Sequence, residues 1–500
     1  MDLSLRNPMW KRSVETNAII SPGYNAWRGG RAAQAAFLID GAEYFTRLEQ
    51  VLKKATQSIF IVGWDFNPDI RLRPQDEGSP TLGEILRARV DAHDNLSVRI
   101  LVWGMGPVYS GKSLRLFQKS GVLDHPRIHL HFDFRHPLRA SHHQKMVCVD
   151  DAVAFLGGID LTARRWDDRS HAIPNPLRCS PDGNCYGPVH DMQAIVAGEA
   201  AMLVGDACRK RWKAALGENL TASSIGIWHE LWPEDLKPSL TDCPVGLALT
   251  EPWRWKGRKG RREAIRLTHD ALRAAHRHIY LESQYLASFG IARTLAKRLK
   301  EPNGPEIVVL VTRESHGFLE KVMMGNNRDR LIRHLKRADR YGRLRVFYSV
   351  TQDKDGKEHE IIVHSKLVII DDRFIRVGSS NLNNRSEGLD TESDLAFEPT
   401  DDAGRQAVLA LRDELIAEHL DADPAEITAS ITETGSLIRT IERFNRKPRG
   451  LRAFSIDVLR GETESLPGTA IVDPRRPFWP FQQVRVGTRW ALSRLARSWL

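Results

Sequence analysis

The sequence predicts an α/β protein made of two similar domains, and an internal repeat is the main reason. A histidine, any residue, a lysine, four further residues and an aspartate occur twice, at His143–Asp150 and at His364–Asp371. Each copy runs into a turn of small residues 14 positions after its histidine, beginning at Gly157 and at Gly378. One copy would be a weak signal, but two copies with the same spacing indicate a duplicated unit.

The repeat extends over complete α/β units. In each copy an apolar helical stripe precedes a strand, and the distance from that strand to the motif is 84 positions from Ile59 to His143 and 85 from Ile279 to His364. Strands that alternate with helices predict mostly parallel sheets. The expected helices are 44–55 and 265–275, and the expected strands are 59–62, 98–102, 128–130 and 146–149, then 279–282, 307–310, 344–346 and 367–370.

The residue types of the two motifs suit the chemistry of a phosphodiester. Its negative charge repels nucleophiles, so a site must neutralise the charge, attack phosphorus and protonate the leaving oxygen. Lys145 and Lys366 can hold the non-bridging oxygens, while one imidazole attacks and the other transfers protons. Such a reaction needs no metal, and we expect neither a metal nor a cofactor.

A plain buried strand is the competing interpretation of either motif alone. The runs 146–149 and 367–370 are apolar and would form core strands whatever precedes them. The strand also explains the spacing, because side chains at i and i+2 point to the same face of a sheet. The matching turns downstream favour the catalytic interpretation over two coincidental core strands.

Length and composition fit two globular domains. The chain has 500 residues, a length that exceeds what one hydrophobic core usually serves. Its residues are 41% hydrophobic and 27% charged, which is ordinary for a globular protein. No apolar run reaches the length of a transmembrane helix, and the first 24 residues lack a signal-peptide core. Cys179 and Cys185 share a loop and could bridge, but nothing indicates export. The predicted division is an extension at 1–36, domains at 37–235 and 236–400, and a helical and basic tail at 401–500.

The motifs closely resemble those of the phospholipase D superfamily, and over about residues 37–400 the chain is most similar to its phosphatidylcholine-type enzymes. The resemblance rests on 142–145, 157–161, 165–168, 280–285, 363–366, 378–381 and 384–386. It implies two α/β sandwich domains related by a pseudo-twofold axis, with one active site at their interface.

The resemblance also implies roles for individual residues. His143 would be the nucleophile and His364 the general acid and base, although the pseudo-symmetry leaves their order open. Glu392 matches the family's orienting acid, which we assign to His364. Asp191 lies in a Val-His-Asp-Met-Gln segment where the family has Trp-His-Asp-x-Gln, and we assign it to His143. The turn residues expected to bind substrate are Gly158, Asp160, Ser379 and Asn381, and those expected to form structural hydrogen bonds at the strand ends are Asp150 and Asp371.

The charge distribution predicts an anionic partner. The net charge is +10, and residues 251–350 hold 23 Lys and Arg against 10 Asp and Glu. Within this region, 253–262 interleaves two tryptophans with six cations. Such a segment suits an anionic membrane surface, would equally suit a nucleic-acid groove, and could simply be a solvated connector.

The tail beyond residue 400 lies outside the repeat. Residues 407–420 predict an amphipathic helix packed on the second domain. From Arg475 to Leu500 there are six arginines and no acid, and apolar residues recur at helical spacing from Leu492 to Trp499. This pattern predicts an interfacial membrane helix, with a helix docked on the protein as the alternative.

Three functions fit these observations. We expect a phospholipase D that cleaves the distal phosphodiester of a glycerophospholipid, with transphosphatidylation as a side reaction. A cardiolipin-synthase-like transferase is the first alternative, but those enzymes carry Asn-Phe-Glu where this chain has 390–392, Asp-Thr-Glu, and usually have N-terminal membrane helices. A nuclease or a binding protein with a decayed site is the second. We expect a monomer that acts on phospholipid rather than nucleic acid, in the cytoplasm, peripheral to a membrane, or secreted by a signal-independent route.

Overall fold

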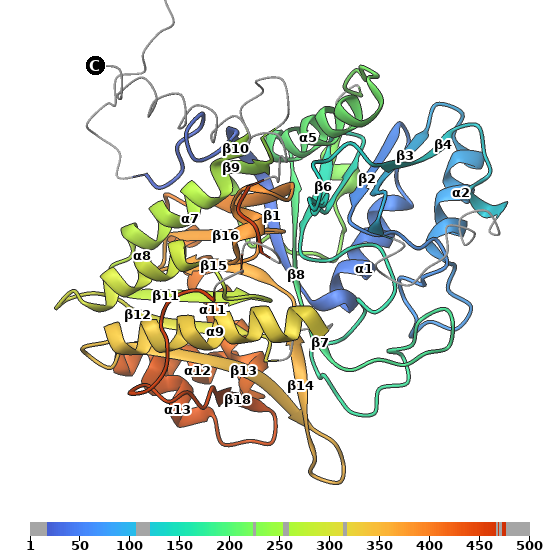
Figure 1. Ribbon diagram of the computed structural model, residues 1–500. Helices are drawn as coiled ribbons and strands as arrows, with labels where there is room; N and C mark the ends of the chain where they lie inside the picture. The colour runs from blue at the N-terminus through green and yellow to red at the C-terminus, as the bar shows by residue number, and fades with distance from the viewer. Residues whose placement is uncertain are drawn as a thin grey trace, which may run out of the picture.

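The architecture is a long run of hydrogen-bonded strands covered by helices on both faces (Figure 1). It is seen in a computed structural model that describes residues 18–106, 121–223, 227–253, 260–313, 318–466, 469 and 473–476, with side chains of the helix at 318–338 described from residue 325.

The first half of the chain orders its strands as β4, β3, β2, β5, β6, β8 and β1. The first three are parallel and the rest pair antiparallel. Their bounds are β1 (Arg28–Ile39), β2 (Ser58–Gly63), β3 (Ser97–Trp103), β4 (Ile128–Asp133), β5 (Met146–Val149), β6 (Val153–Gly157) and β8 (Met192–Ala197).

The second half repeats this order as β13, β12, β11, β15, β16, β17 and β9. The parallel and antiparallel pairs also correspond, so the predicted α/β fold with two similar halves is confirmed. The bounds are β9 (Leu240–Glu251), β11 (His278–Ser283), β12 (Glu306–Val311), β13 (Leu344–Gln352), β15 (Lys366–Ile370), β16 (Phe374–Gly378) and β17 (Glu392–Phe397).

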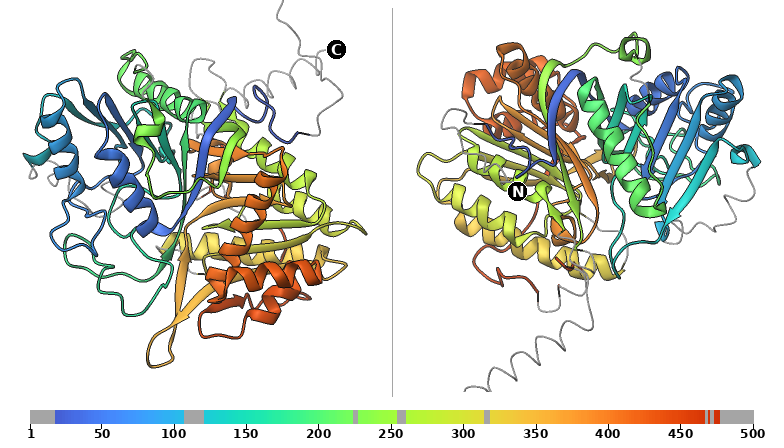
Figure 2. Two further views of the ribbon diagram at one scale, coloured as in Figure 1. Left: turned by 180° about the vertical axis from the view of Figure 1, so that it is seen from behind. Right: turned by 90° about the horizontal axis from the view of Figure 1, so that it is seen from above.

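The two halves meet along β1 and β9, which pair antiparallel with Gly29 opposite Gly246. Figure 2 shows these strands running together between the halves. Because β1 and β9 are hydrogen-bonded to each other, the strands of the two halves form one continuous sheet. Strand β1 begins at Arg28, before residue 37, where the first domain is predicted to start. The domain division at 236 and 400 therefore stays a prediction.

Helices cover both faces of the strands. Ile59 and Ile61 face the core formed with α1 and α2, whereas Phe60 and Val62 face the core shared with α5. This second core also includes Leu367 of the other half, so it runs through the whole molecule. The helices are α1 (Asp40–Leu52), α2 (Leu82–Ala92), α5 (Glu199–Leu216), α7 (Glu263–Ala274), α8 (Phe289–Leu299), α9 (Phe318–Ala338), α11 (Asp402–Leu420), α12 (Pro424–Thr434) and α13 (Leu437–Phe444).

Shorter elements complete the fold. Parallel pairing of β7 (Val189–His190) with β14 (Glu358–Val363) adds a second link between the halves. The strand β18 (Gly450–Ala453) pairs with β13, and β10 (Arg261–Arg262) extends the edge of β9. The remaining short helices are η1 (Gly121–Leu123), α6 (Trp228–Leu231) and α10 (Asn384–Gly388).

The motif aspartates connect the end of one strand to the start of its neighbour through side-chain hydrogen bonds. Asp150 and Asp371 follow β5 and β15 with left-handed φ angles of 52° and 50°. The carboxylate of each accepts hydrogen bonds from three successive backbone amides that lead into β2 or β11. This arrangement is the same in both halves and satisfies the amides at the start of each strand, including those of the buried residues Ser58 and His278.

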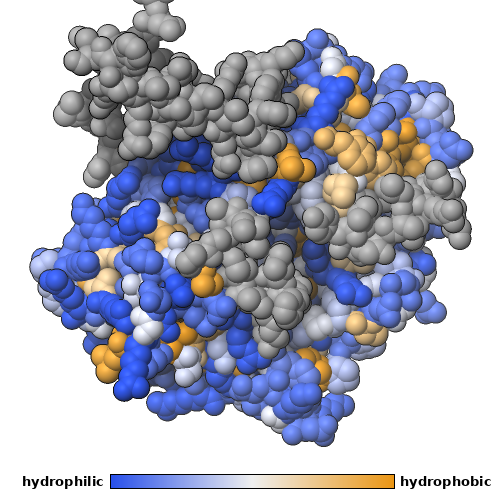
Figure 3. All heavy atoms as spheres, viewed as in Figure 1, coloured by the Kyte–Doolittle hydropathy of each residue, from blue (hydrophilic) through white to orange (hydrophobic). Residues whose placement is uncertain are grey.

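The structure also bears on the predictions for the C-terminal helix, the cysteines and the basic segments. Helix α11 packs on β9 and β18 as expected, and Cys179 and Cys185 form a disulfide. The cationic residues 254–259 and the predicted interfacial helix near the C-terminus lie outside the described residues. None of the helices in the described part of the chain has the length and apolar character needed to span a bilayer. The face of the molecule drawn in Figure 3 is mainly hydrophilic where it is described, and some hydrophobic side chains lie on it.

Candidate active site

The two histidine motifs are tied across the halves by backbone hydrogen bonds. The amide of His143 donates to the carbonyl of Thr391 at 3.0 Å, and the amide of His364 donates to the carbonyl of His190 at 2.7 Å. In both cases the residue after the acceptor is acidic. These two acids, Glu392 and Asp191, are the orienting acids predicted from the sequence.

The side chains follow the same crossed arrangement. His143 Nδ1 lies 3.0 Å from Oε2 of Glu392, and His364 Nδ1 lies 2.6 Å from Oδ2 of Asp191. The predicted partners were the reverse, with each histidine held by an acid of its own half, and that assignment is wrong. Its physical reason is the strand pairing, because the bridges at Thr391 and His190 bring each acid to the opposite motif.

The two orienting acids have different environments. Glu392 accepts from Ser379 Oγ at 2.6 Å and from Ser386 Oγ at 2.7 Å, and burial raises its pKa to about 7. Burial alone would also raise the pKa of Asp191, but the adjacent His364 lowers it below its usual value. Asp191, the partner of His364, therefore has the lower pKa of the two acids and is ionised over a wider pH range than Glu392.

The motif lysines lie behind the imidazoles. Lys145 Nζ is 3.0 Å from Asp160 Oδ2 and donates to the carbonyl of His143 at 3.1 Å. Lys366 Nζ contacts His364 Nδ1 at 3.2 Å and donates to the carbonyl of the same residue. At the position equivalent to Asp160 the second motif has Asn381, so Lys366 lacks the matching carboxylate.

The electrostatic interactions show that both motifs share one site. Burial, then Lys145 and Lys366, lower the pKa of His143 well below its usual value. Burial and Lys366 lower the pKa of His364 to about 3. Burial likewise lowers the pKa of Lys366 to about 7, and Lys145 contributes. Two neutral imidazoles therefore face a site whose cations come from both halves.

Exposure places the imidazoles in front and the lysines behind. The side chains of His143 and His364 are 17% and 11% exposed, whereas Lys145 and Lys366 are 2% exposed or less. When Nδ1 of an imidazole donates to a carboxylate, its Nε2 carries the lone pair. Such a nitrogen can attack phosphorus or accept a proton.

The turn residues support the acids. A Cβ at Gly158 would lie 2.0 Å from Oδ1 of Asp191, so only glycine allows this carboxylate to reach His364. Ser379, the equivalent residue of the second turn, donates to Glu392 instead. The side-chain Oδ1 of Asn381 is buried and accepts no hydrogen bond from the described residues. Direct substrate contacts of these turn residues and of Asp160 stay a prediction.

Sequence reasoning missed two contributors. The charge of Arg165 lowers the pKa of both His364 and Lys366, so a further cation acts on the site. Ser386 supplies the second hydrogen bond to Glu392. Both lie in the segments 165–168 and 384–386 that flank the motifs, and that position was the available signal.

Comparison with known proteins supports the same family. The sequence model named "Phospholipase D" matches residues 51–226 and 324–445, together more than half of the chain. Phospholipase D2 of Bos taurus is 24% identical over 469 residues, covering 72% of this chain and 49% of that protein. Phospholipase D alpha 4 of Arabidopsis thaliana is 23% identical over 513 residues, covering 78% and 65%. Phospholipase D A of Dictyostelium discoideum is 23% identical over 418 residues, covering 72% and 32%.

The chain thus spans between about a third and two thirds of the length of these curated relatives. Among solved structures, phosphatidylserine synthase of Haemophilus influenzae shares the fold with a TM-score of 0.54 at 13% identity, covering 83% of this chain and 96% of that one. The family match, the duplicated strand order and the paired histidine motifs agree. This chain belongs to the phospholipase D family.

Proposed function

We propose that this protein is a phospholipase D that hydrolyses the distal phosphodiester bond of glycerophospholipids to phosphatidic acid and a free alcohol. The observation that carries the proposal is the crossed pairing of His143 with Glu392 and of His364 with Asp191, beside two buried lysines. This arrangement supplies a nucleophile, a proton carrier and charge neutralisation at one place.

In the first step, His143 Nε2 attacks phosphorus and the bond from phosphorus to the headgroup oxygen breaks. Lys145 and Lys366 hold the non-bridging oxygens through charge-assisted hydrogen bonds. His364 gives its proton to the leaving oxygen, which departs as the alcohol. The anionic substrate opposes the lysine charges that lower the pKa of His364, so substrate binding favours the protonated acid.

In the second step, His364 accepts a proton from water, and the resulting hydroxide attacks phosphorus. The bond from phosphorus to His143 then breaks, which releases phosphatidic acid and restores the imidazole. An alcohol in place of water gives transphosphatidylation through the same exchange of bonds. Glu392 holds the imidazole of the nucleophile in one tautomer throughout.

The proposed setting is the surface of an anionic membrane, with the protein bound peripherally as a monomer. The excess of Lys and Arg in residues 251–350 supports this setting. Phospholipid is the proposed substrate, and nucleic acid is not.

The decisive experiment incubates the full-length protein with a mixed phospholipid pool and with DNA, and identifies the products by mass spectrometry. We expect phosphatidic acid and free headgroup alcohol, with phosphatidylalcohol when a short alcohol is added. The His143→Ala variant should give neither. Cardiolipin as the main product would instead support the transferase, and DNA fragments with intact lipid would support a nuclease.

A further inference from the structure

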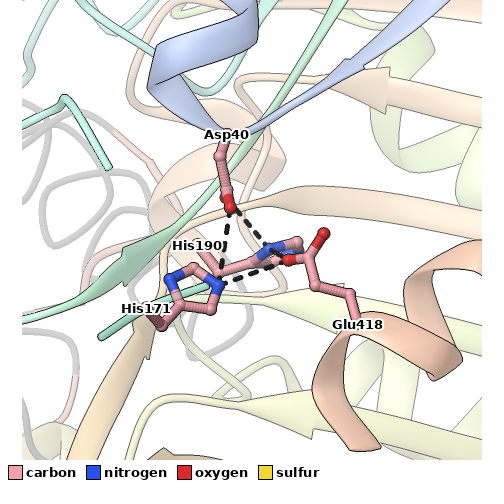
Figure 4. Close-up of side chains that lie close together, drawn as sticks. All are labelled: Asp40, His171, His190 and Glu418. Carbon is pink, nitrogen blue, oxygen red and sulfur yellow. Dashed lines mark hydrogen bonds and ion pairs between the residues drawn. The ribbon is translucent and has the colours of Figure 1, made fainter. Parts of the chain in front are cut away.

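A second cluster of histidines and carboxylates lies in the protein interior beneath the candidate active site. Figure 4 shows four side chains converging from separate elements. All of them are buried. They are Asp40 at the start of α1, His171 in the loop before β7, His190 in β7 and Glu418 near the end of α11.

Nitrogen and oxygen atoms of the four side chains lie close to one another. His171 Nε2 lies 3.4 Å from Asp40 Oδ2 and 3.3 Å from Glu418 Oε1. His190 Nδ1 lies 3.1 Å from Asp40 Oδ1 and 2.8 Å from Glu418 Oε1. All four ligand atoms lie within 4.8 Å of one another. A tetrahedral zinc ion with bonds of about 2.0–2.2 Å holds its ligand atoms about 3.3–3.6 Å apart.

Each histidine is also held from its far side by a further carboxylate. His171 Nδ1 lies 2.9 Å from Asp167 Oδ2, and His190 Nε2 lies 3.0 Å from Glu282 Oε2. Metal-binding histidines characteristically donate their other ring N–H to a carboxylate, which fixes the tautomer that leaves the ligand nitrogen unprotonated. Both histidines of the cluster meet this condition, although they use different ring nitrogens.

The cluster contains more carboxylates than permanently charged cations. Asp40, Glu418, Asp167 and Glu282 bring four carboxylates into the interior, and Arg178 balances one of them through Asp167 at 2.8 Å. Asp40 Oδ2 and Glu418 Oε2 are buried and accept no hydrogen bond from any described residue. A buried anionic oxygen without a donor is costly unless a metal ion or a proton neutralises it.

We propose that Asp40, His171, His190 and Glu418 bind a divalent transition-metal ion, with zinc favoured by the two-nitrogen, two-oxygen ligand set. Four protein ligands in a buried position make the site structural, because a catalytic site keeps a coordination position open. The reaction proposed above needs no metal, so this ion would stand outside the group transfer. It would join α11 of the C-terminal segment to α1 and β7 of the first half.

The ion would also position the active site. The amide of Asp191 donates to Oδ1 of Asp40 at 3.1 Å, and the amide of Asp40 donates to the carbonyl of Asp191 at 2.9 Å. Asp191 in turn holds His364, whose own amide donates to the carbonyl of His190. Fixing Asp40 and His190 therefore fixes the acid that orients His364, and the four ligands are positioning residues rather than catalytic ones.

A neighbouring group offers an internal control. His190, Glu282 and His419 also gather their nitrogens and an oxygen within 4.8 Å, but they use the other ring nitrogen of His190. His419 is buried on α11 next to Glu418 and is absent from the proposed ligand set. His419→Gln is thus a matched control for His171→Gln, since each removes one fully buried imidazole.

The test is the metal content of the full-length protein, purified without a metal-affinity step and measured by inductively coupled plasma mass spectrometry. We expect about one zinc ion per chain, given one four-ligand site. His171→Gln and Glu418→Gln should lose at least nine tenths of it, whereas His419→Gln should retain it. Protein reconstituted with Co²⁺ should show the intense visible absorption of a four-coordinate ion.

Metal content below one ion per ten chains in protein grown with added zinc would overturn the proposal and leave two protonated imidazoles as the balancing charges. Loss in His419→Gln with retention in His171→Gln would also overturn it, because the ion would then lie in the neighbouring group. Circular dichroism checks that each variant is folded. If a variant does not fold, the metal content of the wild-type protein decides whether the site exists. Metal content is independent of lipid cleavage, so this result stands apart from the proposed function.

Discussion

His143 and Glu392 are 249 residues apart in the chain, yet Nδ1 of the imidazole and Oε2 of the carboxylate lie 3.0 Å from each other. The histidine comes from the first half and the acid from β17 of the second. The His364–Asp191 pair crosses in the opposite direction. Neither half can orient its own histidine, so the candidate active site requires the whole duplicated fold.

The two histidines should differ in their effect on a covalent intermediate. If His143 is the nucleophile, His364→Ala should form a phosphorylated enzyme from an activated substrate and release it slowly, because the proton carrier is missing. His143→Ala should form none. Intact-mass spectrometry of both variants checks this, and a stable adduct on His143→Ala alone would exchange the two roles.

The crossed pairing predicts which acid serves which step. With an activated leaving group, bond cleavage needs no general acid, so Asp191→Asn should keep a rapid burst but slow turnover by about 10²–10⁴-fold. Glu392→Gln should slow the burst itself, because it orients the nucleophile. Rapid-quench measurements separate the two phases. Pairing of each histidine with the acid of its own half would give the opposite result.

The pH dependence of activity should follow the titration of Lys366. Burial and the charge of Lys145 lower the pKa of this lysine to about 7. Deprotonation removes a cation that holds phosphate, so kcat/KM on a monomeric short-chain lipid should fall as pH rises through about 7. The bound anion favours the protonated lysine, so kcat should fall only at higher pH.

Lys366→Arg supplies the control for this profile. Arginine keeps its charge throughout, so the variant should lose the fall above pH 7 while working at a lower level, because guanidinium geometry differs. Glu392 also has a pKa of about 7, and the residue is still present in Lys366→Arg, so a fall in activity caused by Glu392 would persist in this variant. An identical fall in Lys366→Arg would assign the titration to another group.

The motif aspartates should matter for stability rather than chemistry. Asp371→Asn replaces one acceptor oxygen by an NH₂ group facing a backbone N–H, which should cost about 1–3 kcal/mol in the free energy of unfolding. Asparagine tolerates the φ of 50°, so backbone strain does not contribute. Denaturant unfolding, with activity expressed per folded molecule, measures both quantities.

Asp150→Asn is the matched variant, because the Asp150 carboxylate accepts hydrogen bonds from the three equivalent amides of the first half. We expect a similar loss of stability and near-normal activity of the folded fraction. Loss of activity without loss of stability in either variant would mean that the aspartate acts on substrate.

The basic C-terminal segment should bind membranes. Deleting residues 484–500 should weaken sedimentation with anionic vesicles but spare cleavage of monomeric lipid, and added salt should mimic the deletion. Substitution by Gln should reproduce the loss at Arg485, Arg489, Arg494 and Arg497. Unchanged vesicle binding with a lowered melting temperature would instead mean that the segment docks on the protein.

The sequence by itself determined the repeated units and the residues of the candidate site. The spacings of 84 and 85 positions correspond to equivalent strands, and the apolar runs at 146–149 and 367–370 form β5 and β15. These features are local or repeated, so periodicity and spacing are enough to find them. Asp191 and Glu392 were identified by a different route, the resemblance of the short segments around them to those of the phospholipase D family.

Only the tertiary structure decided which acid serves which histidine. Strand pairing across the halves depends on hydrogen bonds between residues such as His143 and Thr391, and no local pattern encodes a contact over that distance. The same holds for the pairing of β1 with β9 and for the convergence of Asp40 with Glu418. Local propensity selects the strands, whereas burial and backbone hydrogen bonding select their partners, and those partners arrange the site.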